Sequence, residues 1–127
     1  MRPAERMKRR VRPPVPKDVR SPLTPTEARL QQANAMSEKE LQALIIELAE
    51  LKGWLVYHTH DSRRSNPGFP DLCMVKWKRV VFAELKTQKG RRTPKQIVWG
   101  ESLQLSDAEY YLWRPLDWLD RTVAKVI

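Results

Sequence analysis

The segment from residue 38 to 52 has apolar residues at helical spacing, which predicts an amphipathic helix. Ser37 and Glu40 form a capping-box pattern, in which the Ser37 side chain accepts from the Glu40 amide and the Glu40 side chain reaches back. Gly53 follows as the expected left-handed C-terminal residue. We therefore expect a helix over residues 38–52 with one buried face, made of Leu41, Leu44, Ile45, Leu48 and Leu51.

Three apolar segments rich in β-branched and aromatic residues follow this helix and predict strands at 54–60, 72–77 and 80–86. Only Lys78 and Arg79 separate the last two segments, so we expect an antiparallel hairpin in which Trp77 faces Val80 across a two-residue turn. Both faces of this hairpin are mostly apolar. A sheet of this kind must be covered on both faces.

Two of the three remaining elements begin at proline residues. Thr93 and Pro94 have the form of a helix start, which predicts a helix from residue 94 to about 104. Residues 109–113 predict a fourth strand, and residues 115 to about 126 predict a last helix whose buried side chains are Trp118, Leu119, Val123 and Val126. The expected order is α-β-β-β-α-β-α. This is an α/β fold with a mixed four-stranded sheet flanked by helices, in an α/β/α sandwich.

Residues 1–36 differ from the rest of the chain in composition. They hold six of the ten prolines and nine Lys or Arg against three Asp or Glu, with few large apolar side chains to bury. We expect this basic, proline-rich tail to be disordered and residues 37–127 to form the domain. Residues 24–27 could begin a short helix over residues 25 to about 35, which would have little to pack on.

Composition limits the class of protein. The 127 residues suit one domain and exclude a multidomain machine. No stretch reaches the roughly 18 to 20 apolar residues of a membrane helix, and the first residues lack the apolar run of a signal peptide, so we expect a soluble, cytoplasmic protein with no membrane partner. The single cysteine, Cys73, excludes an intramolecular disulfide and a four-thiolate zinc site. A net charge of +9 favours a polyanionic partner, with nucleic acid as the first candidate.

The expected hairpin brings three charged residues to one face of the sheet. In the register described above, Asp71 stands opposite Lys86 and Cys73 stands opposite Glu84. Asp71 and Glu84 are then diagonal neighbours with backbone positions roughly 7 to 8 Å apart, so both side chains can reach one ion. Asp71 could instead be an ordinary residue at the start of a strand, and Glu84 with Lys86 a surface pair worth at most about 1 kcal/mol. Charges at the ends of apolar strands are rarely left without a role, which favours the catalytic interpretation.

Several short motifs, in this order, resemble the VRR-NUC family of the PD-(D/E)XK nuclease superfamily. They are SEKEL at 37–41, GFPD at 68–71, AELK at 83–86, and Gln96 with Trp99 downstream. The resemblance covers residues 37–115, and the stand-alone type found in phages and bacteria is the most similar in length. The family usually has a glycine between the second helix and the last strand, where this chain has residues 106–108, Ser-Asp-Ala.

The resemblance implies a Mg²⁺-dependent endonuclease in which Mn²⁺ can substitute. Asp71, Glu84 and the backbone carbonyl of Leu85 would hold the ion, with Glu38 bound directly or through water. These are the oxygen ligands that Mg²⁺ prefers. Lys86 would hold or deprotonate the attacking water and stabilise the developing charge. The implied products carry 5′-phosphate and 3′-hydroxyl ends.

Stand-alone members of the family suggest branched DNA, in particular the four-way Holliday junction, as the substrate. Junction resolution needs two symmetric cuts, which implies a homodimer. A monomeric flap, nicking or restriction-like nuclease is an alternative, and a non-catalytic module that binds DNA through its basic loops alone is another. A phage-encoded enzyme would act in the host cytoplasm.

Some residue roles stay open at this level. The capping box uses Glu40, which favours Glu38 over Glu40 as the helical carboxylate of the site. Gln96 can be a helix-cap residue, can lie near the metal site or the DNA backbone as in the family, or can do both. His58 and His60 share one face of their strand but lack a third ligand at zinc spacing. Basic residues in the two loops beside the site are expected to bind DNA phosphates; they are Arg63, Arg64, Lys89, Arg91, Arg92 and Lys95.

Overall fold

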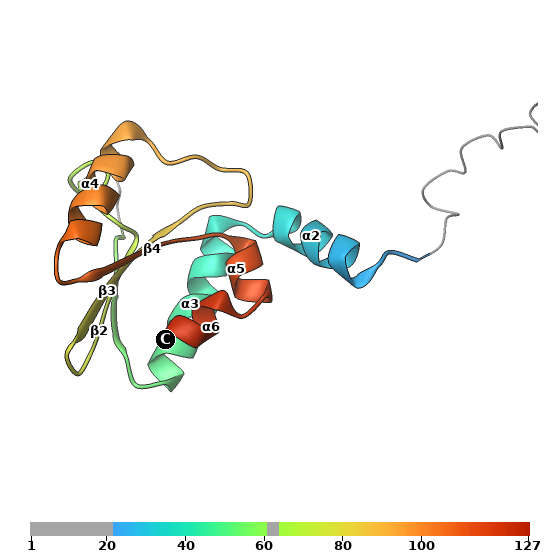
Figure 1. The fold of residues 1–127 in the computed structure, drawn as a ribbon, viewed down its shortest axis with the longest axis horizontal. Coiled ribbons are helices and arrows are strands. Elements are labelled where there is room, and N and C mark those ends of the chain that lie inside the picture. Colours follow the sequence, from blue (N-terminus) through green and yellow to red (C-terminus); the bar gives the residue numbers. More distant parts are fainter. Residues whose placement is uncertain (1–21, 61–63) are drawn as a thin grey trace, which may run out of the picture.

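The computed structural model describes residues 22–60 and 64–127, and its centre is one four-stranded sheet (Figure 1). The strands lie across the sheet in chain order: β1 (Leu55–His58), β2 (Leu72–Lys76), β3 (Arg79–Leu85) and β4 (Glu109–Trp113). The pairs β1–β2 and β2–β3 are antiparallel, whereas β4 runs parallel to β3. The expected mixed sheet is confirmed.

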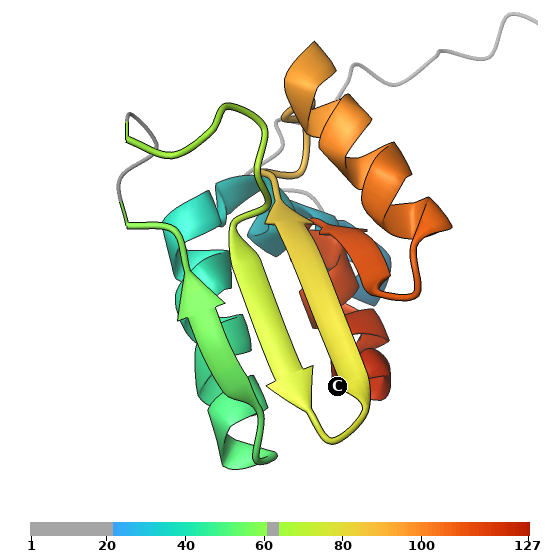
Figure 2. The ribbon, with the colours of Figure 1, turned by 90° about the vertical axis from the view of Figure 1, so that its left-hand side faces the viewer.

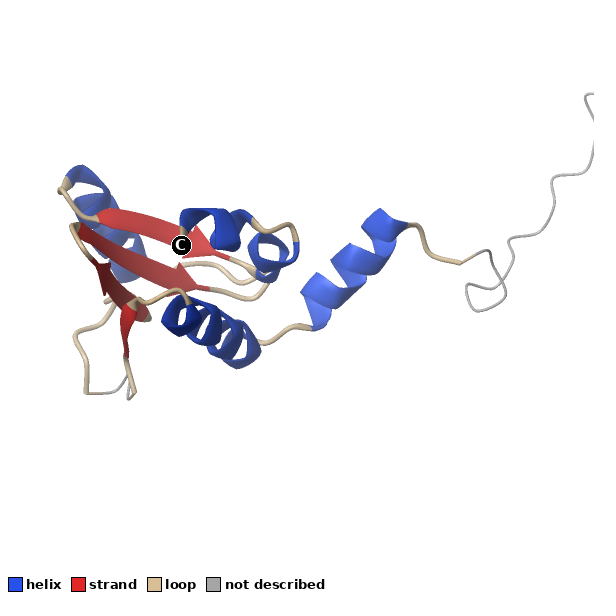
Figure 3. Ribbon diagram, turned by 90° about the horizontal axis from the view of Figure 1, so that it is seen from below, coloured by secondary structure: helices blue, strands red, loops and turns tan. Residues whose placement is uncertain are grey.

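Helices lie on both faces of the sheet, but unequally (Figure 2). Three of them, α3 (Glu38–Leu51), α5 (Pro115–Leu119) and α6 (Thr122–Val126), lie on one face, and α4 (Pro94–Leu105) lies on the other. The short helix expected in the tail is α2 (Pro25–Ala35), at one end of the domain (Figure 3). It has a packing partner after all, because it contacts α5 and buries Ala33 completely. None of the helices in the described ranges is long and apolar enough to span a membrane.

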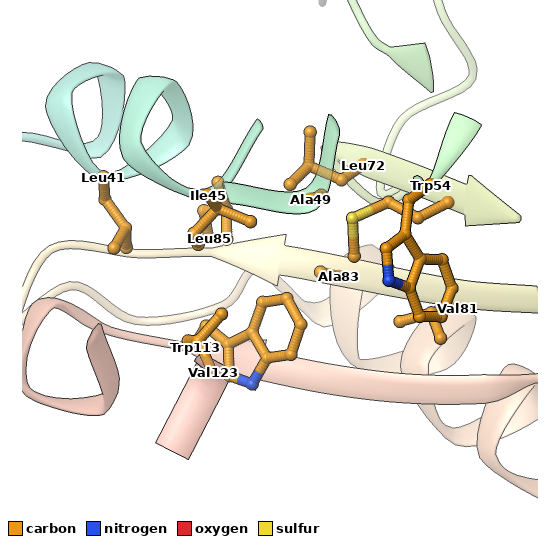
Figure 4. Close-up of a cluster of buried hydrophobic side chains, with 11 residues drawn as sticks. Leu41, Ile45, Ala49, Trp54, Leu72, Val81, Ala83, Leu85, Trp113 and Val123 are labelled. Atoms are coloured by element: carbon orange, nitrogen blue, oxygen red, sulfur yellow. The ribbon is translucent and has the colours of Figure 1, made fainter. Parts of the chain in front are cut away.

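The hydrophobic core lies between the sheet and the layer of α3, α5 and α6 (Figure 4). From the helices come Leu41, Ile45 and Val123, all fully buried. The sheet contributes Leu72, Met74, Val81, Ala83, Leu85 and Trp113. Each large side chain that is fully buried contributes about 1.5–3 kcal/mol, so this one face fixes the sheet in position.

The opposite face of the sheet is only partly covered, whereas we expected both faces to be covered. The 12 residues of α4 cover the part of this face near β4, where Gly100 lies against the Tyr110 ring. A single helix of this length does not reach β1. The apolar side chains left exposed, here called the open patch, are Leu55 (75% exposed), Tyr57 (61%), Val75 (36%) and Val80 (36%).

The hairpin of β2 and β3 turns one residue earlier than expected. Its turn consists of Trp77 and Lys78, so Lys76 pairs with Arg79. Trp77 adopts a left-handed conformation with φ of 55°, at a cost of about 1–2 kcal/mol. Contacts of Arg79 offset this cost: its guanidinium donates to both carboxylate oxygens of Glu109 at 2.8 Å and to a carbonyl of α6 at 2.9 Å. It also lies over a buried tryptophan ring, 5.0 Å from the centroid.

This register changes the pairs at the other end of the hairpin. The pairing, continued by one position beyond β2, puts Asp71 opposite Glu84. The expected pairs, Asp71 with Lys86 and Cys73 with Glu84, are therefore wrong by two positions. A shift of two positions leaves every side chain on its own face, whereas a shift of one would have moved it to the other. Asp71 and Glu84 consequently share a face, as expected.

The C-terminal segment forms two short helices instead of the one expected. Arg121, between α5 and α6, has a left-handed φ of 67°. The Asp120 side chain accepts from the Thr122 amide at 3.0 Å and from its hydroxyl at 2.6 Å, so a new helix start forms inside the apolar pattern. The spacing of apolar residues cannot reveal this break. Val123 is fully buried in the observed pair of helices, as it would be in one continuous helix.

The turn between α4 and β4 is made without the usual glycine. The Ser106 hydroxyl donates to the Leu103 carbonyl at 2.6 Å and accepts from the Ala108 amide at 3.1 Å. A serine side chain therefore supplies the hydrogen bonds of the turn.

Candidate active site

Two carboxylates meet at one end of the hairpin. Asp71 directly precedes β2, and Glu84 is the penultimate residue of β3. The Leu85 amide donates to Oδ2 of Asp71 at 2.8 Å, which fixes this carboxylate against the end of β3. The Asp71 carbonyl accepts from the Thr59 amide at 3.1 Å, which ties it to the end of β1 as well. Asp71 and Glu84 are thus opposed neighbours rather than the diagonal pair that we expected.

Glu84 is the buried charged residue of the described chain, with 2% of its surface exposed. The pKa of Glu84 is raised to about 9, mainly by burial and in addition by hydrogen bonding to and repulsion by Asp71. The charge of Lys86 acts the other way and lowers this pKa. A buried carboxyl that stays protonated at neutral pH in the absence of a cation is typical of functional sites.

Gln96 joins α4 to this carboxyl pair. Its Oε1 accepts from the Thr93 amide at 2.8 Å, and its Nε2 donates to Oε1 of Glu84 at 3.3 Å. Of the roles left open, the structure therefore shows the helix cap and the place beside Glu84 together. One amide side chain can do both because its oxygen accepts while its nitrogen donates.

Gly68 allows the loop before Asp71 to lie against the start of α4. Its φ is +91°, and a Cβ atom there would lie 2.5 Å from the main-chain carbonyl of Lys95. No larger residue fits without a backbone shift. This glycine belongs to the GFPD motif at 68–71. The motif therefore provides both the Asp71 carboxylate and the glycine that allows close packing against α4.

Lys86 and Glu38 complete the surroundings of Glu84. The Lys86 amide donates to the Trp113 carbonyl at 3.1 Å, which holds the end of β3 against β4. The charge of Glu38, at the start of α3, contributes to the raised pKa of Glu84. Glu40 is occupied by the capping box with Ser37, at 3.0 and 3.4 Å. The geometry therefore favours Glu38 as the helical carboxylate near the site.

The donor set can be tested for its fit to a metal ion. Within the described residues, no three His, Cys, Asp or Glu side chains are close enough together to form a ready metal site. Asp71 and Glu84 nevertheless offer hard oxygen atoms at one point, and no Lys or Arg of residues 22–60 and 64–127 forms a salt bridge with either. Such a pair fits Mg²⁺, which needs one or two carboxylates and keeps its remaining ligands as water. His58 and His60 stack on each other with centroids 4.1 Å apart and gain no third ligand.

The basic residues expected to bind DNA fall into three groups. Lys89, Arg91 and Lys95 are exposed, in the segment that links β3 to α4 and at the start of α4. Arg92 is half-buried and donates to the Tyr110 hydroxyl at 3.4 Å. Arg64 is exposed, and Arg63 lies outside the described residues. The contact of Tyr110 with Arg92 was not predicted from the sequence. A tyrosine in a half-buried strand does not indicate which residue its hydroxyl will bind.

Comparisons with known proteins bear on the fold. No model of a known protein family matches the chain, and no curated protein does. Its structure is similar to a solved structure described as "VRR_NUC domain", with a TM-score of 0.59 and 23% sequence identity. The match covers 73% of this chain and 100% of that one. The chain thus shares the α/β fold of this VRR_NUC domain, which is the fold that the sequence motifs led us to expect.

Proposed function

We propose that the chain is a nuclease of the PD-(D/E)XK type that hydrolyses DNA phosphodiester bonds with a bound divalent cation. The observation that carries the proposal is the opposed pair of Asp71 and Glu84, with Glu84 2% exposed and neither carboxylate in a salt bridge to a described residue. Removing a carboxylate from water is expensive unless a cation or a proton compensates it. The likeness to a VRR_NUC domain supports the same conclusion.

Each residue of the site has a proposed role. When bound, Mg²⁺ or Mn²⁺ would activate a water molecule and offset charge on the phosphate. Asp71, Glu84 and the Leu85 carbonyl would hold the ion, and the exposed Glu38 would act through water. Lys86 would hold the attacking water and stabilise the developing negative charge, and Gln96 would orient Glu84. Cleavage would leave 5′-phosphate and 3′-hydroxyl ends.

The finer proposal is a structure-selective enzyme that cuts Holliday junctions as a homodimer. The open patch supports a contact between two copies. Its positions on β1, β2 and β3 carry no charged side chain in a chain with a net charge of +9, so a second copy can meet it without like-charge repulsion. A DNA backbone, by contrast, would require cations there.

Cleavage assays test the nuclease proposal. Labelled four-way junction, flap, linear duplex and single-stranded DNA are incubated with Mg²⁺, with Mn²⁺ or with chelator, using wild type and Lys86→Ala. We expect junction cleavage with either metal, none with chelator, and a loss of about 10²–10⁴-fold in the variant, the usual value of a positioned proton-transfer group. Binding without cleavage by wild type under all conditions would support the non-catalytic module instead.

Light scattering coupled to size exclusion tests the homodimer. We expect a dimer for wild type and a monomer for Leu55→Lys, which places a charge in the open patch. A monomer that still cuts flaps or single strands would favour the monomeric alternative. Ser102→Lys is a matched control, because Ser102 is exposed on α4 outside the patch.

A further inference from the structure

The segment that links β3 to α4 is held in shape by a residue far along the chain. Nη1 of Arg114 donates to three main-chain carbonyls, those of Thr87 at 2.8 Å, Gln88 at 3.4 Å and Gly90 at 2.5 Å. The Gln88 side chain in turn accepts from the Leu116 amide at 3.0 Å. Hydrogen bonds from a charged donor are the stronger kind, so this turn has a fixed backbone rather than the freedom of an ordinary surface loop.

The outer side of this turn faces α2. Figure 1 shows the β3–α4 connection reaching toward that helix. Asn34 of α2, Thr87, Gln88 and Lys89 line a recess of about 190 Å³ between them. The side chains of these residues carry an ammonium, a hydroxyl and two amides, and no Asp or Glu is among them. These are the groups with which proteins bind DNA phosphates.

The recess lies close to the proposed cleavage site along the chain. Lys89 is three positions after Lys86, which is at most about 10 Å of extended chain. One strand of DNA rises about 3.4 Å per nucleotide. A phosphate in the recess would therefore lie within about three nucleotides of a phosphate held at Lys86. The buried Ala33 anchors α2 on α5, so Asn34 is presented from a fixed helix.

We propose that this recess binds a backbone phosphate of the DNA substrate and that Arg114 is the positioning residue that shapes it. This inference rests on the proposed function, because it names how DNA is held beside the same site. Arg114 acts through the carbonyls of the turn, and Lys89 and Asn34 make the contact. Of these residues, only Lys89 was expected from the sequence to bind DNA, since Asn34 falls in the segment assigned to the tail and Arg114 follows a strand without any motif.

The test is DNA binding in chelator over a range of salt concentrations, which does not depend on cleavage. We expect Lys89→Ala to lower the slope of log affinity against log salt by about one, the signature of one lost phosphate contact. Asn34→Ala and Arg114→Ala should each weaken binding about three- to tenfold at physiological salt. Arg79→Ala is the matched control, because Arg79 also makes three hydrogen bonds but lies at the far end of the sheet; it should bind as wild type does.

A double variant separates positioning from direct contact. If Arg114 acts through the turn, Arg114→Ala combined with Lys89→Ala should bind no more weakly than the worse single variant. Additive losses would mean that Arg114 touches DNA itself, and wild-type binding by Asn34→Ala and Lys89→Ala would overturn the recess. These two exposed positions test it even if Arg114→Ala does not fold. A wild-type protein that binds DNA with the expected slopes but never cuts it would contradict the nuclease proposal and leave the recess supported.

Discussion

Two glutamates on neighbouring strands have opposite surroundings. Glu109, at the start of β4, accepts from Arg79 at 2.8 Å through both oxygens and from the Tyr111 hydroxyl at 2.7 Å. The hydrogen bonds from Arg79 hold the pKa of Glu109 below its usual value. Glu84, near the end of β3, is 2% exposed and lies against another carboxyl and the Gln96 amide, and burial raises its pKa to about 9.

Under the proposed function, this difference separates a stabilising end of the sheet from a functional end. At the turn end of β3, the Arg79 guanidinium pairs with the Glu109 carboxylate, and this ion pair links β3 to β4. At the site end, Glu84 and Asp71 face each other without a salt bridge from any described residue. Two facing carboxyl groups without a cation lower the stability of the folded state, and a bound ligand can offset this loss. Active sites commonly reduce stability in this way.

The largest expected effect comes from exchanging one carboxylate at each end for its amide. Asp71→Asn should reduce cleavage by about 10³-fold or more, which is about 4 kcal/mol of transition-state stabilisation. Glu109→Gln should cleave within about twofold of wild type, because its partners lie at the other end of the sheet. Single-turnover rates with saturating Mg²⁺ measure both. Equal losses in the two variants would mean that the site end has no special role.

The next effect is expected in the pH dependence of stability. A carboxyl whose pKa is raised on folding destabilises the folded state as pH rises from its unfolded value, about 4.3, to its folded value. Metal-free wild type should therefore lose stability between about pH 5 and pH 9, the value to which burial raises the pKa of Glu84. Glu84→Gln should lack this loss. Urea unfolding at several pH values, in chelator, measures the difference.

Magnesium provides the complementary measurement. Millimolar Mg²⁺ should raise the melting temperature of wild type, by an amount equivalent to about 2.7 kcal/mol at one hundred times its Kd, and should do much less for Glu84→Gln. Glu109→Gln should respond as wild type does. The same shift in all three proteins would place the ion elsewhere.

Two glycines extend the comparison to the backbone. Gly68 at the site end and Gly53 at the turn end both have φ near +90°. Alanine at either should cost about 1 kcal/mol for the left-handed conformation. A Cβ at Gly53 meets only the end of the Lys76 side chain at 3.9 Å, whereas at Gly68 it meets the Lys95 backbone at 2.5 Å. Gly68→Ala should therefore destabilise the fold by about 1–3 kcal/mol more than Gly53→Ala. It should also slow cleavage, whereas Gly53→Ala should leave the cleavage rate unchanged. Thermal unfolding and cleavage rates of the two variants measure these differences.

The order of elements and the shared face of the site could be predicted from the sequence, for a physical reason. Side chains alternate with a period of two, so Asp71 and Glu84 had to share a face in any register that buried Leu72 and Ala83 together. The register itself could not be predicted, because it depends on contacts that Arg79 makes with residues distant in the sequence. The uncovered part of the sheet was missed for a similar reason: an apolar pattern shows which faces can be buried, but not whether one short helix is long enough to bury them.

The smallest expected effect returns to Glu109. A carboxyl whose pKa is lowered on folding stabilises the folded state above its unfolded pKa, and this contribution is lost as pH falls through the folded value. Wild type should therefore lose stability below about pH 4.3 through this group, a trend opposite in direction to that of Glu84. Because Glu109 is partly exposed, with 31% of its side chain accessible, the contribution should stay below about 1 kcal/mol. Glu109→Gln should flatten the acid limb of the stability curve, whereas Glu84→Gln should leave that limb unchanged and flatten the curve between about pH 5 and 9. If both variants flattened the same limb, the two ends of the sheet would not be electrostatically independent, and the separation of stability from function would fail.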